Sequence, residues 1–368
     1  MQVQRLILAS VFLSLTLIGN LGLAWAQEPK IKSESTEPST IPEITEEHFR
    51  IFRGDGSTAT LDDILQAAQS VEVIFLGEYH DDPVAHFLEK QVLSKLIQQT
   101  SNQNQNLALS MEMFERDVQH ILDEYLSGLI SENHLTKSGR TWTNYESDYR
   151  PLVELAKQNG VPVIAANAPR RYVNLVGRQG RDALLQIKRP ADRGLPPLPY
   201  AQASKVYANK FNNLMEKFRK QRAEAAKKSK PESTKQESSA NKTANEDEPQ
   251  KLTKQPNKTP TKKPTSRGSS LDAQSLWDAA MAYSIVEQFL RDPGCQVVHI
   301  NGSFHTEKRL GIPEHLLRYR PSTSFLVVTM VASDSFPAFD SQEMINAGDF
   351  VIVTDNSLPR SYDFKTKK

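Results

Sequence analysis

Two short turns of the pattern Gly-x-x-His, each at the end of an apolar run, hold the residues of this chain best suited to chemistry. The first turn covers residues 77–80 and the second covers residues 302–305. Glycine lets a chain turn sharply, so the histidine three residues later is able to point back over the edge of a sheet. A third apolar run ends near a glutamate. We therefore expect four side chains to meet in one pocket, those of Glu78, His80, Glu112 and His305.

Imidazole and carboxylate groups that converge in this way suit two kinds of chemistry. They bind divalent metals such as zinc or manganese, with His80, His305 and Glu78 as the expected ligands, and they serve as general acids and bases. The alternative is structural, since each histidine could satisfy a loop hydrogen bond and each glutamate could cap a helix. Asp81 and Asp82, directly before Pro83, have the character of helix N-caps.

The elements that would position these residues follow from the apolar pattern. Six short runs are mostly continuous in apolar residues, which is typical of strands in a sheet covered on both faces. They cover residues 71–76, 107–113, 161–166, 296–301, 325–331 and 350–354. Helical patterns fill the gaps at residues 83–99, 116–129, 145–159, 169–176, 201–222 and 271–291.

Strands that alternate with helices predict an α/β fold with a mostly parallel central sheet flanked by helices. The helices at 201–222 and 271–291 follow one another without a strand, so we expect a small helical hairpin subdomain there. Between them, residues 221–270 carry 12 Lys or Arg and 6 Asp or Glu, contain no aromatic residue and have Leu252 as their one large aliphatic residue. We expect this low-complexity insertion to be disordered.

The first 26 residues have the pattern of a secretory signal peptide. Arg5 precedes an apolar run that ends in Ala24-Trp25-Ala26, a small-residue cleavage pattern. We expect cleavage after Ala26 and export to the periplasm or another extracytoplasmic space, with an uncleaved membrane anchor as the alternative. Residues 27–45 then form a polar tether, and residues 46–368 form the α/β domain interrupted by the insertion.

Charge and cysteine usage narrow the function classes. The net charge is +1, which argues against a nucleic-acid-binding protein. The insertion has a net charge of +6, so we expect either a solvated loop or a peripheral contact with an anionic surface. The single cysteine, Cys295, excludes an intramolecular disulfide and precedes an apolar strand, where a small buried hydrophobic residue is expected.

Beyond these patterns, the chain resembles the ChaN-like haem-binding proteins of the haem-binding uptake and Tiki superfamily. The motifs that carry the resemblance span roughly residues 50–330 in the family's order. They are FLGEYHDD at 75–82, SMEMFER at 110–116, LDEYLSG at 122–128, Trp142 with Tyr145 and YRPLV at 149–153, ANAPR at 166–170, AQSLWD with Met281 and Ala282, and NGSFH at 301–305. The family is often lipid-anchored, but this chain has no cysteine near the expected cleavage site.

The resemblance implies a homodimer that holds two haems face to face at its interface, each ferric iron bound by a tyrosine. Tyrosinate is a suitable ligand for ferric haem. We expect the ligand within the two helices around the insertion, and we favour Tyr283, then Tyr207, with Tyr200 as a further candidate. Each of these tyrosines could instead be a core or interface residue.

The resemblance also leaves two other functions open. The wider superfamily is similar to metal-dependent proteases of the Tiki type and to erythromycin esterases, which implies a metal-dependent hydrolase acting through Glu78, His80, Glu112 and His305. A scaffold that keeps the fold without a working site is the third possibility. We expect a haem-handling protein rather than an enzyme, with haem, and in the second case a divalent metal, as the cofactor.

Overall fold

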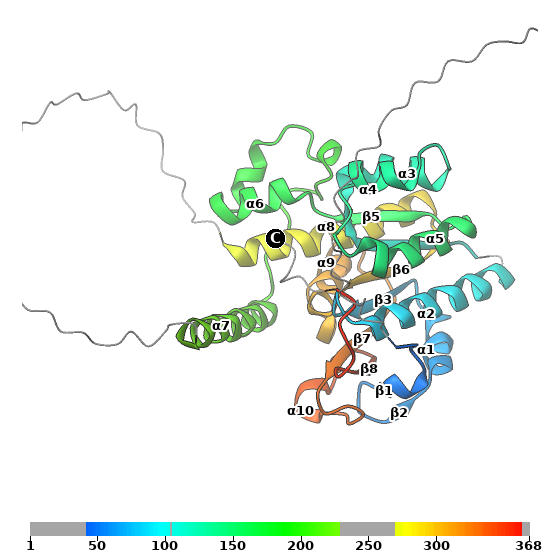
Figure 1. Cartoon of the computed structure of the whole chain (residues 1–368). Helices are drawn as coiled ribbons and strands as arrows, with labels where there is room; N and C mark the ends of the chain where they lie inside the picture. Colours follow the sequence, from blue (N-terminus) through cyan, green and yellow to red (C-terminus); the bar gives the residue numbers. More distant parts are fainter. Residues whose placement is uncertain (1–41, 104, 229–268, 363–368) are drawn as a thin grey trace, which may run out of the picture. The chain divides into compact units, whose positions relative to one another are not determined.

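An eight-stranded sheet forms the centre of the computed structural model, which describes residues 42–103, 105–228 and 269–362. The strand order is β2-β1-β8-β7-β3-β6-β4-β5 (Figure 1). The strands are β1 (Phe49–Arg53), β2 (Thr58–Ala59), β3 (Val73–Glu78), β4 (Leu107–Glu115), β5 (Val163–Asn167), β6 (Gln296–Gly302), β7 (Phe325–Ser333) and β8 (Phe350–Asp355).

The six strands from β8 to β5 are parallel, and β1 pairs antiparallel with both β2 and β8. The predicted mostly parallel α/β fold is therefore confirmed, and all six expected strands are present. β1 and β2 were not expected from the sequence. β1 reads Phe-Arg-Ile-Phe-Arg and buries only Ile51 fully, so it lacks the continuous apolar run that marks the central strands.

Helices cover both faces of the sheet. The α-helices are α1 (Leu61–Ala68), α2 (Pro83–Asn102), α3 (Gln119–Leu126), α4 (Glu132–Ser138), α5 (Arg150–Gln158), α6 (Arg170–Gln179), α7 (Lys205–Lys228), α8 (Ser270–Arg291), α9 (Ile312–Tyr319) and α10 (Ser341–Met344). A π-helical turn, Tyr145–Tyr149, leads into α5.

Alternate residues of each strand enter different cores because successive side chains point to opposite faces. Ile74 and Leu76 of β3 pack with residues of α1, α2 and α5. Val73 and Phe75 pack on the other face with residues of α8 and α9. Both faces of β3 are thus buried, as its uninterrupted apolar sequence predicts.

The two helices that flank the insertion differ in how much they touch the rest of the domain. α8 packs along β5, α6 and α9, whereas α7 contacts the domain through its first turns, where Tyr207 and Phe211 lie against Phe304. The two helices meet where Gln274 Nε2 donates to Tyr207 Oη over 3.4 Å. α7 extends away from the other helices (Figure 1).

Several expectations fall on residues outside the described ranges. The signal peptide at 1–26, most of the tether at 27–45 and residues 229–268 of the insertion are among them. The first eight residues of the predicted insertion, 221–228, continue α7. Within residues 42–103, 105–228 and 269–362, no helix is both long enough and apolar enough to cross a membrane.

Candidate functional site

The strand order places the two Gly-x-x-His turns side by side. β6 lies between β3 and β4 in the sheet, and Glu78 at the end of β3 is in register with Gly302 at the end of β6. On the other side of β6, Met111 of β4 pairs with Ile300, so Glu112 reaches the same edge. Since the carboxyl ends of parallel strands are where open α/β sheets bind ligands, this edge is the candidate site.

Glu78 is the centre of a buried group of side chains that we call the Glu78 cluster. Its carboxylate is fully buried. Glu78 Oε1 accepts a hydrogen bond from Tyr149 Oη over 2.7 Å and lies 2.7 Å from His80 Nδ1. Glu78 Oε2 lies 3.1 Å from His86 Nδ1, which in turn lies 3.2 Å from Glu89 Oε2. The cluster therefore consists of Glu78, His80, His86, Glu89 and Tyr149.

The sequence of α2 explains how the cluster is assembled. Asp82 caps the helix by accepting from Val84 N over 2.9 Å, and Pro83 stands in the first turn, as the sequence predicts for Asp82. Asp81 is instead 3.9 Å from Arg360. His86 and Glu89 are three residues apart on α2, so both face the strand end. Both are buried, and Glu89 is completely so.

The charges in the cluster shift one another's pKa values. Burial opposes ionisation of Glu78, but the imidazoles of His86 and His80 hold its pKa well below the usual range. Burial also opposes protonation of His80, yet the hydrogen bond and charge of Glu78 raise its pKa to about 9. Burial and the neighbouring charge of Glu78 raise the pKa of Glu89 well above normal. At neutral pH, His80 is therefore a proton donor held against a carboxylate.

A second group, which we call the His305 cluster, lies on the other side of β6. His305 Nδ1 is 2.5 Å from Asp278 Oδ1 of α8, and His305 Nε2 is 3.5 Å from Glu112 Oε1. All three side chains are less than one tenth exposed. Burial works against protonation of His305, but the charges of Glu112 and Asp278 raise its pKa. The cluster consists of Glu112, Asp278 and His305.

Gly302 is where the two clusters meet. Its backbone N donates to Glu112 Oε2 over 2.8 Å. A Cβ atom at this position would lie 2.9 Å from Cε1 and Nε2 of His80. The ring of His80 therefore covers the glycine, with the carboxylate of Glu112 beside it. The structure places the four expected residues Glu78, His80, Glu112 and His305 around one strand end.

Several members of these clusters were not predicted as site residues. His86 and Glu89 were missed, although their three-residue spacing behind Pro83 is a signal in the sequence. Asp278 and Tyr149 lie in motifs that the family resemblance contains, but neither has a local pattern that points to Glu78 or His305. Of the three expected metal ligands, Glu78 belongs to the tight ligand group found among the described residues, with His86 and Glu89 and ligand atoms within 4.8 Å of one another. His80 and His305 lie outside that group.

The candidate haem tyrosines differ in accessibility. Tyr200 and Tyr207 are 2% and 1% exposed. Tyr200 Oη donates to the backbone oxygen of Asp272 over 2.8 Å. Burial and, in second place, Asp278 raise the pKa of Tyr207 well above normal, and burial raises that of Tyr200. Tyr283 is half-buried, with its ring 5.3 Å from that of Tyr319 and 5.5 Å from the guanidinium of Arg116.

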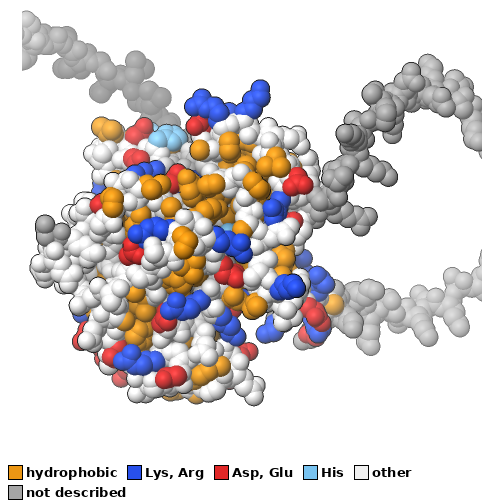
Figure 2. All heavy atoms as spheres, turned by 180° about the vertical axis from the view of Figure 1, so that it is seen from behind, with side chains coloured by type: hydrophobic (Ala, Val, Ile, Leu, Met, Phe, Trp, Pro, Cys, Tyr) orange, Lys and Arg blue, Asp and Glu red, His pale blue; other side chains and the backbone are white. Residues whose placement is uncertain are grey.

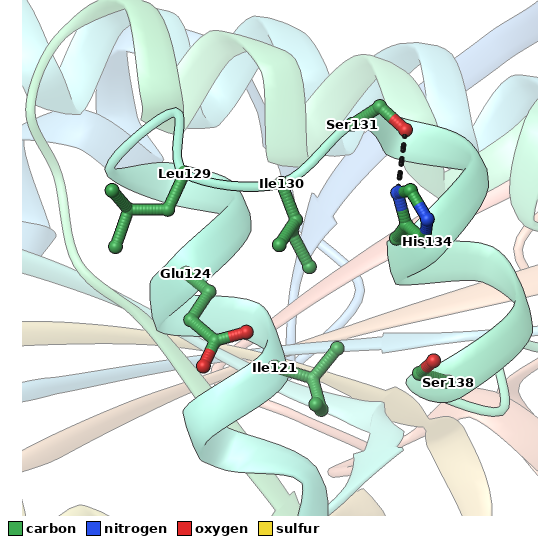
Figure 3. A pocket seen from close by; sticks show the side chains of 7 residues that line it. All are labelled: Ile121, Glu124, Leu129, Ile130, Ser131, His134 and Ser138. Carbon is green, nitrogen blue, oxygen red and sulfur yellow. Dashed lines mark hydrogen bonds between the residues drawn. The ribbon is translucent and has the colours of Figure 1, made fainter.

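The described part of the chain has two surface cavities that bear on the candidate site. One, of about 300 Å³, lies between α3 and α4 (Figure 3), where His134 Nδ1 is 3.0 Å from Ser131 Oγ of the same helix start. The other, of about 360 Å³, is lined by Trp142, Arg140, Arg170, Thr141 and Thr143. Trp142 is edge-on to His80, with 4.9 Å between ring centroids, so the second cavity opens beside the Glu78 cluster.

Comparisons with known proteins agree with this architecture. Residues 64–316 match the family model described as haem-binding uptake, Tiki superfamily, ChaN. A solved structure described as cofacial haem binding to ChaN of Campylobacter jejuni is 18% identical, with a TM-score of 0.57, and the match covers 84% of this chain and 98% of the other. Identity this low shows a shared fold.

Two further similarities are weaker. An erythromycin esterase in its open conformation is 9% identical with a TM-score of 0.43, over 85% of this chain and 98% of the other. The chloroplastic protein RETICULATA-RELATED 5 of Arabidopsis thaliana is 24% identical over 123 residues, which are 33% of this chain. That match spans 17% of the length of the plant protein.

Proposed function

We propose that this chain, which belongs to the ChaN family of haem-binding uptake proteins in the Tiki superfamily, binds ferric haem through Tyr283. The observation that carries the proposal is the family match over residues 64–316. This range contains both Gly-x-x-His turns and all three candidate tyrosines. Function in haem or iron handling follows from the family, and the choice of ligand follows from the surroundings of each tyrosine.

The surroundings of Tyr283 fit a flat, anionic cofactor. Tyr283 is half-buried, and Leu290, about two turns further along the same face of α8, is 74% exposed. Arg116 lies at the Tyr283 ring, and Arg320 lies over Phe289 at 4.8 Å. Guanidinium groups pair well with carboxylates such as the haem propionates. Arg116 is paired with Glu287 and Arg320 with Glu72, so the propionates would replace these partners. The face behind that of Figure 1 gathers hydrophobic side chains between basic ones (Figure 2).

Tyr207 and Tyr200 suit the ligand role less well. Each is almost completely buried, and each hydroxyl already has a partner within the domain. Iron ligation would require these hydroxyls to leave their partners and the side chains to become accessible. A half-buried tyrosine beside a cation needs a smaller rearrangement, because the positive charge also stabilises a phenolate.

We also propose that the protein is exported and that a second copy completes the haem site. The signal-like segment 1–26 supports export, and the +6 charge of residues 221–270 supports peripheral contact with an anionic surface. A dimer would shield the outer face of a haem that one copy leaves open. Analytical ultracentrifugation with and without haem tests the dimer, because it measures the molar mass of the protein in solution. We expect the mass of two chains when haem is bound.

The ligand assignment is tested by titrating ferric haem into the full chain and recording absorption spectra. We expect a high-spin ferric spectrum that Tyr283→Phe weakens or abolishes. Tyr200→Phe is the matched control, because its hydroxyl donates to the Asp272 carbonyl. A change with Tyr207→Phe alone would move the ligand to α7. If haem binds unchanged to all three variants, the iron is not held by these tyrosines.

Hydrolysis at the strand ends is the second candidate function. The observation that favours it is the pairing of two histidines with carboxylates, His80 with Glu78 and His305 with Asp278, around Gly302. Because Glu78 raises the pKa of His80 to about 9, His80 would act as a general acid near neutral pH. The cavity at Trp142 would admit the substrate.

A panel of chromogenic esters and peptides tests this second function. We expect His80→Ala to abolish any hydrolysis. Haem binding should be kept, since His80 is not one of the candidate haem ligands. His134→Ala is the control, because His134 lines the separate cavity between α3 and α4. Equal activity in wild type and His80→Ala would remove the hydrolase from consideration.

A further inference from the structure

The innermost part of the Glu78 cluster, away from His80, contains two carboxylates that the functions above do not use. The side chains of Glu78 and Glu89 are completely buried, and that of His86 is 7% exposed. Among the described residues, Glu89 Oε1 is a buried oxygen without a hydrogen-bond partner, and Glu78 Oε2 makes no assigned hydrogen bond but lies 3.1 Å from His86 Nδ1. Buried carboxylates are tolerated when they are paired, protonated or bound to a metal. Burial opposes protonation of His86, but Glu78 and Glu89 raise its pKa well above normal. The positive charge between the two carboxylates is therefore either a proton on His86 or a bound cation that takes the place of that proton.

The neighbours of His86 decide which of its ring nitrogens carries a proton. His86 Nε2 is 3.3 Å from the backbone oxygen of His80 and 3.5 Å from Asp148 Oδ2. Both neighbours are acceptors, so Nε2 is a donor. Asn144 Nδ2 donates to the same two oxygens over 3.0 Å and 2.8 Å, which fixes their positions. In the neutral ring, Nδ1 then presents a lone pair, the arrangement that a metal-binding histidine needs.

The distances from His86 Nδ1 to the two carboxylates suit a small divalent cation, and the three ligand atoms all lie within 4.8 Å of one another. His86 Nδ1 lies 3.1 Å from Glu78 Oε2 and 3.2 Å from Glu89 Oε2, so one N–H could not point straight at both oxygens. Two ligands at about 2.1 Å from a zinc ion lie roughly 3.0–3.4 Å apart at angles between octahedral and tetrahedral. One nitrogen and two carboxylate oxygens match the ligand types of zinc and manganese.

We propose that Glu78, His86 and Glu89 form a binding site for one divalent transition-metal cation, of the Zn²⁺ or Mn²⁺ class, beneath the strand-end site. Two carboxylates and one neutral imidazole neutralise the 2+ charge of the cation. Tyr149, which donates to Glu78 Oε1, and Asp148, beside His86 Nε2, orient two of the three ligands. The site is separate from Tyr283, so it does not depend on haem binding.

His80 gives the buried site its route to solvent. Its side chain is 32% exposed and covers the outer side of Glu78, next to the cavity at Trp142. A rotation of His80 would open a path from that cavity to Glu78. The cation would then lie behind the residue that the second candidate function uses as an acid.

The test is a calorimetric titration of the full chain, made metal-free by dialysis against a chelator, with Zn²⁺ alone and separately with Mn²⁺ alone. We expect about one cation per chain. Glu89→Gln keeps the shape of the side chain and removes a ligand charge. We expect it to weaken binding by more than the roughly 10- to 100-fold that loss of a merely orienting partner costs. Glu89→Asp should restore part of the affinity.

Glu112→Gln is the matched control, since it makes the same change in a buried carboxylate of the His305 cluster. We expect its affinity to equal that of wild type, and we expect the cation to raise the melting temperature of wild type and Glu112→Gln but not of Glu89→Gln. Circular dichroism verifies that each variant is folded. Three results would each overturn the site: no cation on the folded wild type, equal affinity in Glu89→Gln, or a wild-type melting temperature that neither cation changes, which would mean that the cluster shares a proton instead.

Discussion

Glutamate has opposite surroundings at the carboxyl edge of the sheet and on the outer turns of α7. Glu78 is completely buried and contacts two histidines and a tyrosine. Glu216, on α7, is 58% exposed and pairs with Lys220 at 2.8 Å in the next turn. The partner of Glu216 is four residues away in the chain, whereas Tyr149 is 71 residues away from Glu78.

This difference shows what each region depends on. The ion pair on α7 is local and exposed, so water replaces either partner at little cost. The innermost side chains of the Glu78 cluster are buried, so solvent does not readily replace a lost partner. Its members come from a strand, the turn after it, a helix and a π-helical turn. Its charges are therefore supported only by the assembled fold, and removing one leaves the others buried without compensation.

The largest effect is expected from removing the carboxylate at the centre of the Glu78 cluster. Glu78→Ala leaves His80, His86 and Tyr149 without their shared acceptor. We expect the free energy of unfolding, measured with urea, to fall by about 3–5 kcal/mol, as for other buried ion pairs that lose one partner. Glu216→Ala on α7 is the matched change in the exposed region, and we expect no measurable loss. Equal effects of the two substitutions would contradict the account of the cluster.

Much of the fold was predictable because its signals are local. The central strands are continuously apolar, and Pro83 after Asp82 marks the start of α2. The antiparallel pair β1 and β2 was not predictable, because β1 alternates with arginine and β2 has two residues. The sheet order, with β6 between β3 and β4, depends on packing between distant segments and has no local signal.

The candidate site also has parts that the sequence predicts and parts that it does not. The Gly-x-x-His turns were visible in the sequence, since glycine after an apolar run is a local pattern. Asp278 was not assigned to His305, because their contact joins the middle of α8 to a strand end. The accessibility of the tyrosines was also beyond the sequence, because Tyr207 and Tyr283 have similar helical contexts but differ in burial.

A smaller effect on stability is expected from a substitution at Gly302, where the two clusters meet, because this substitution removes no charge. Gly302 has φ −59° and ψ 133°, which alanine adopts without strain. Gly302→Ala, however, places a methyl group 2.9 Å from the His80 ring, which Glu78 and Trp142 hold in place. We expect a loss of about 1–3 kcal/mol in the free energy of unfolding, typical of overpacking, and a changed His80 imidazole signal in NMR spectra. Gly294→Ala is the control, because an added Cβ there meets nothing within 4 Å. If Gly302→Ala leaves both the stability and the His80 signal unchanged, His80 does not lie over Gly302 and the two turns do not share one site.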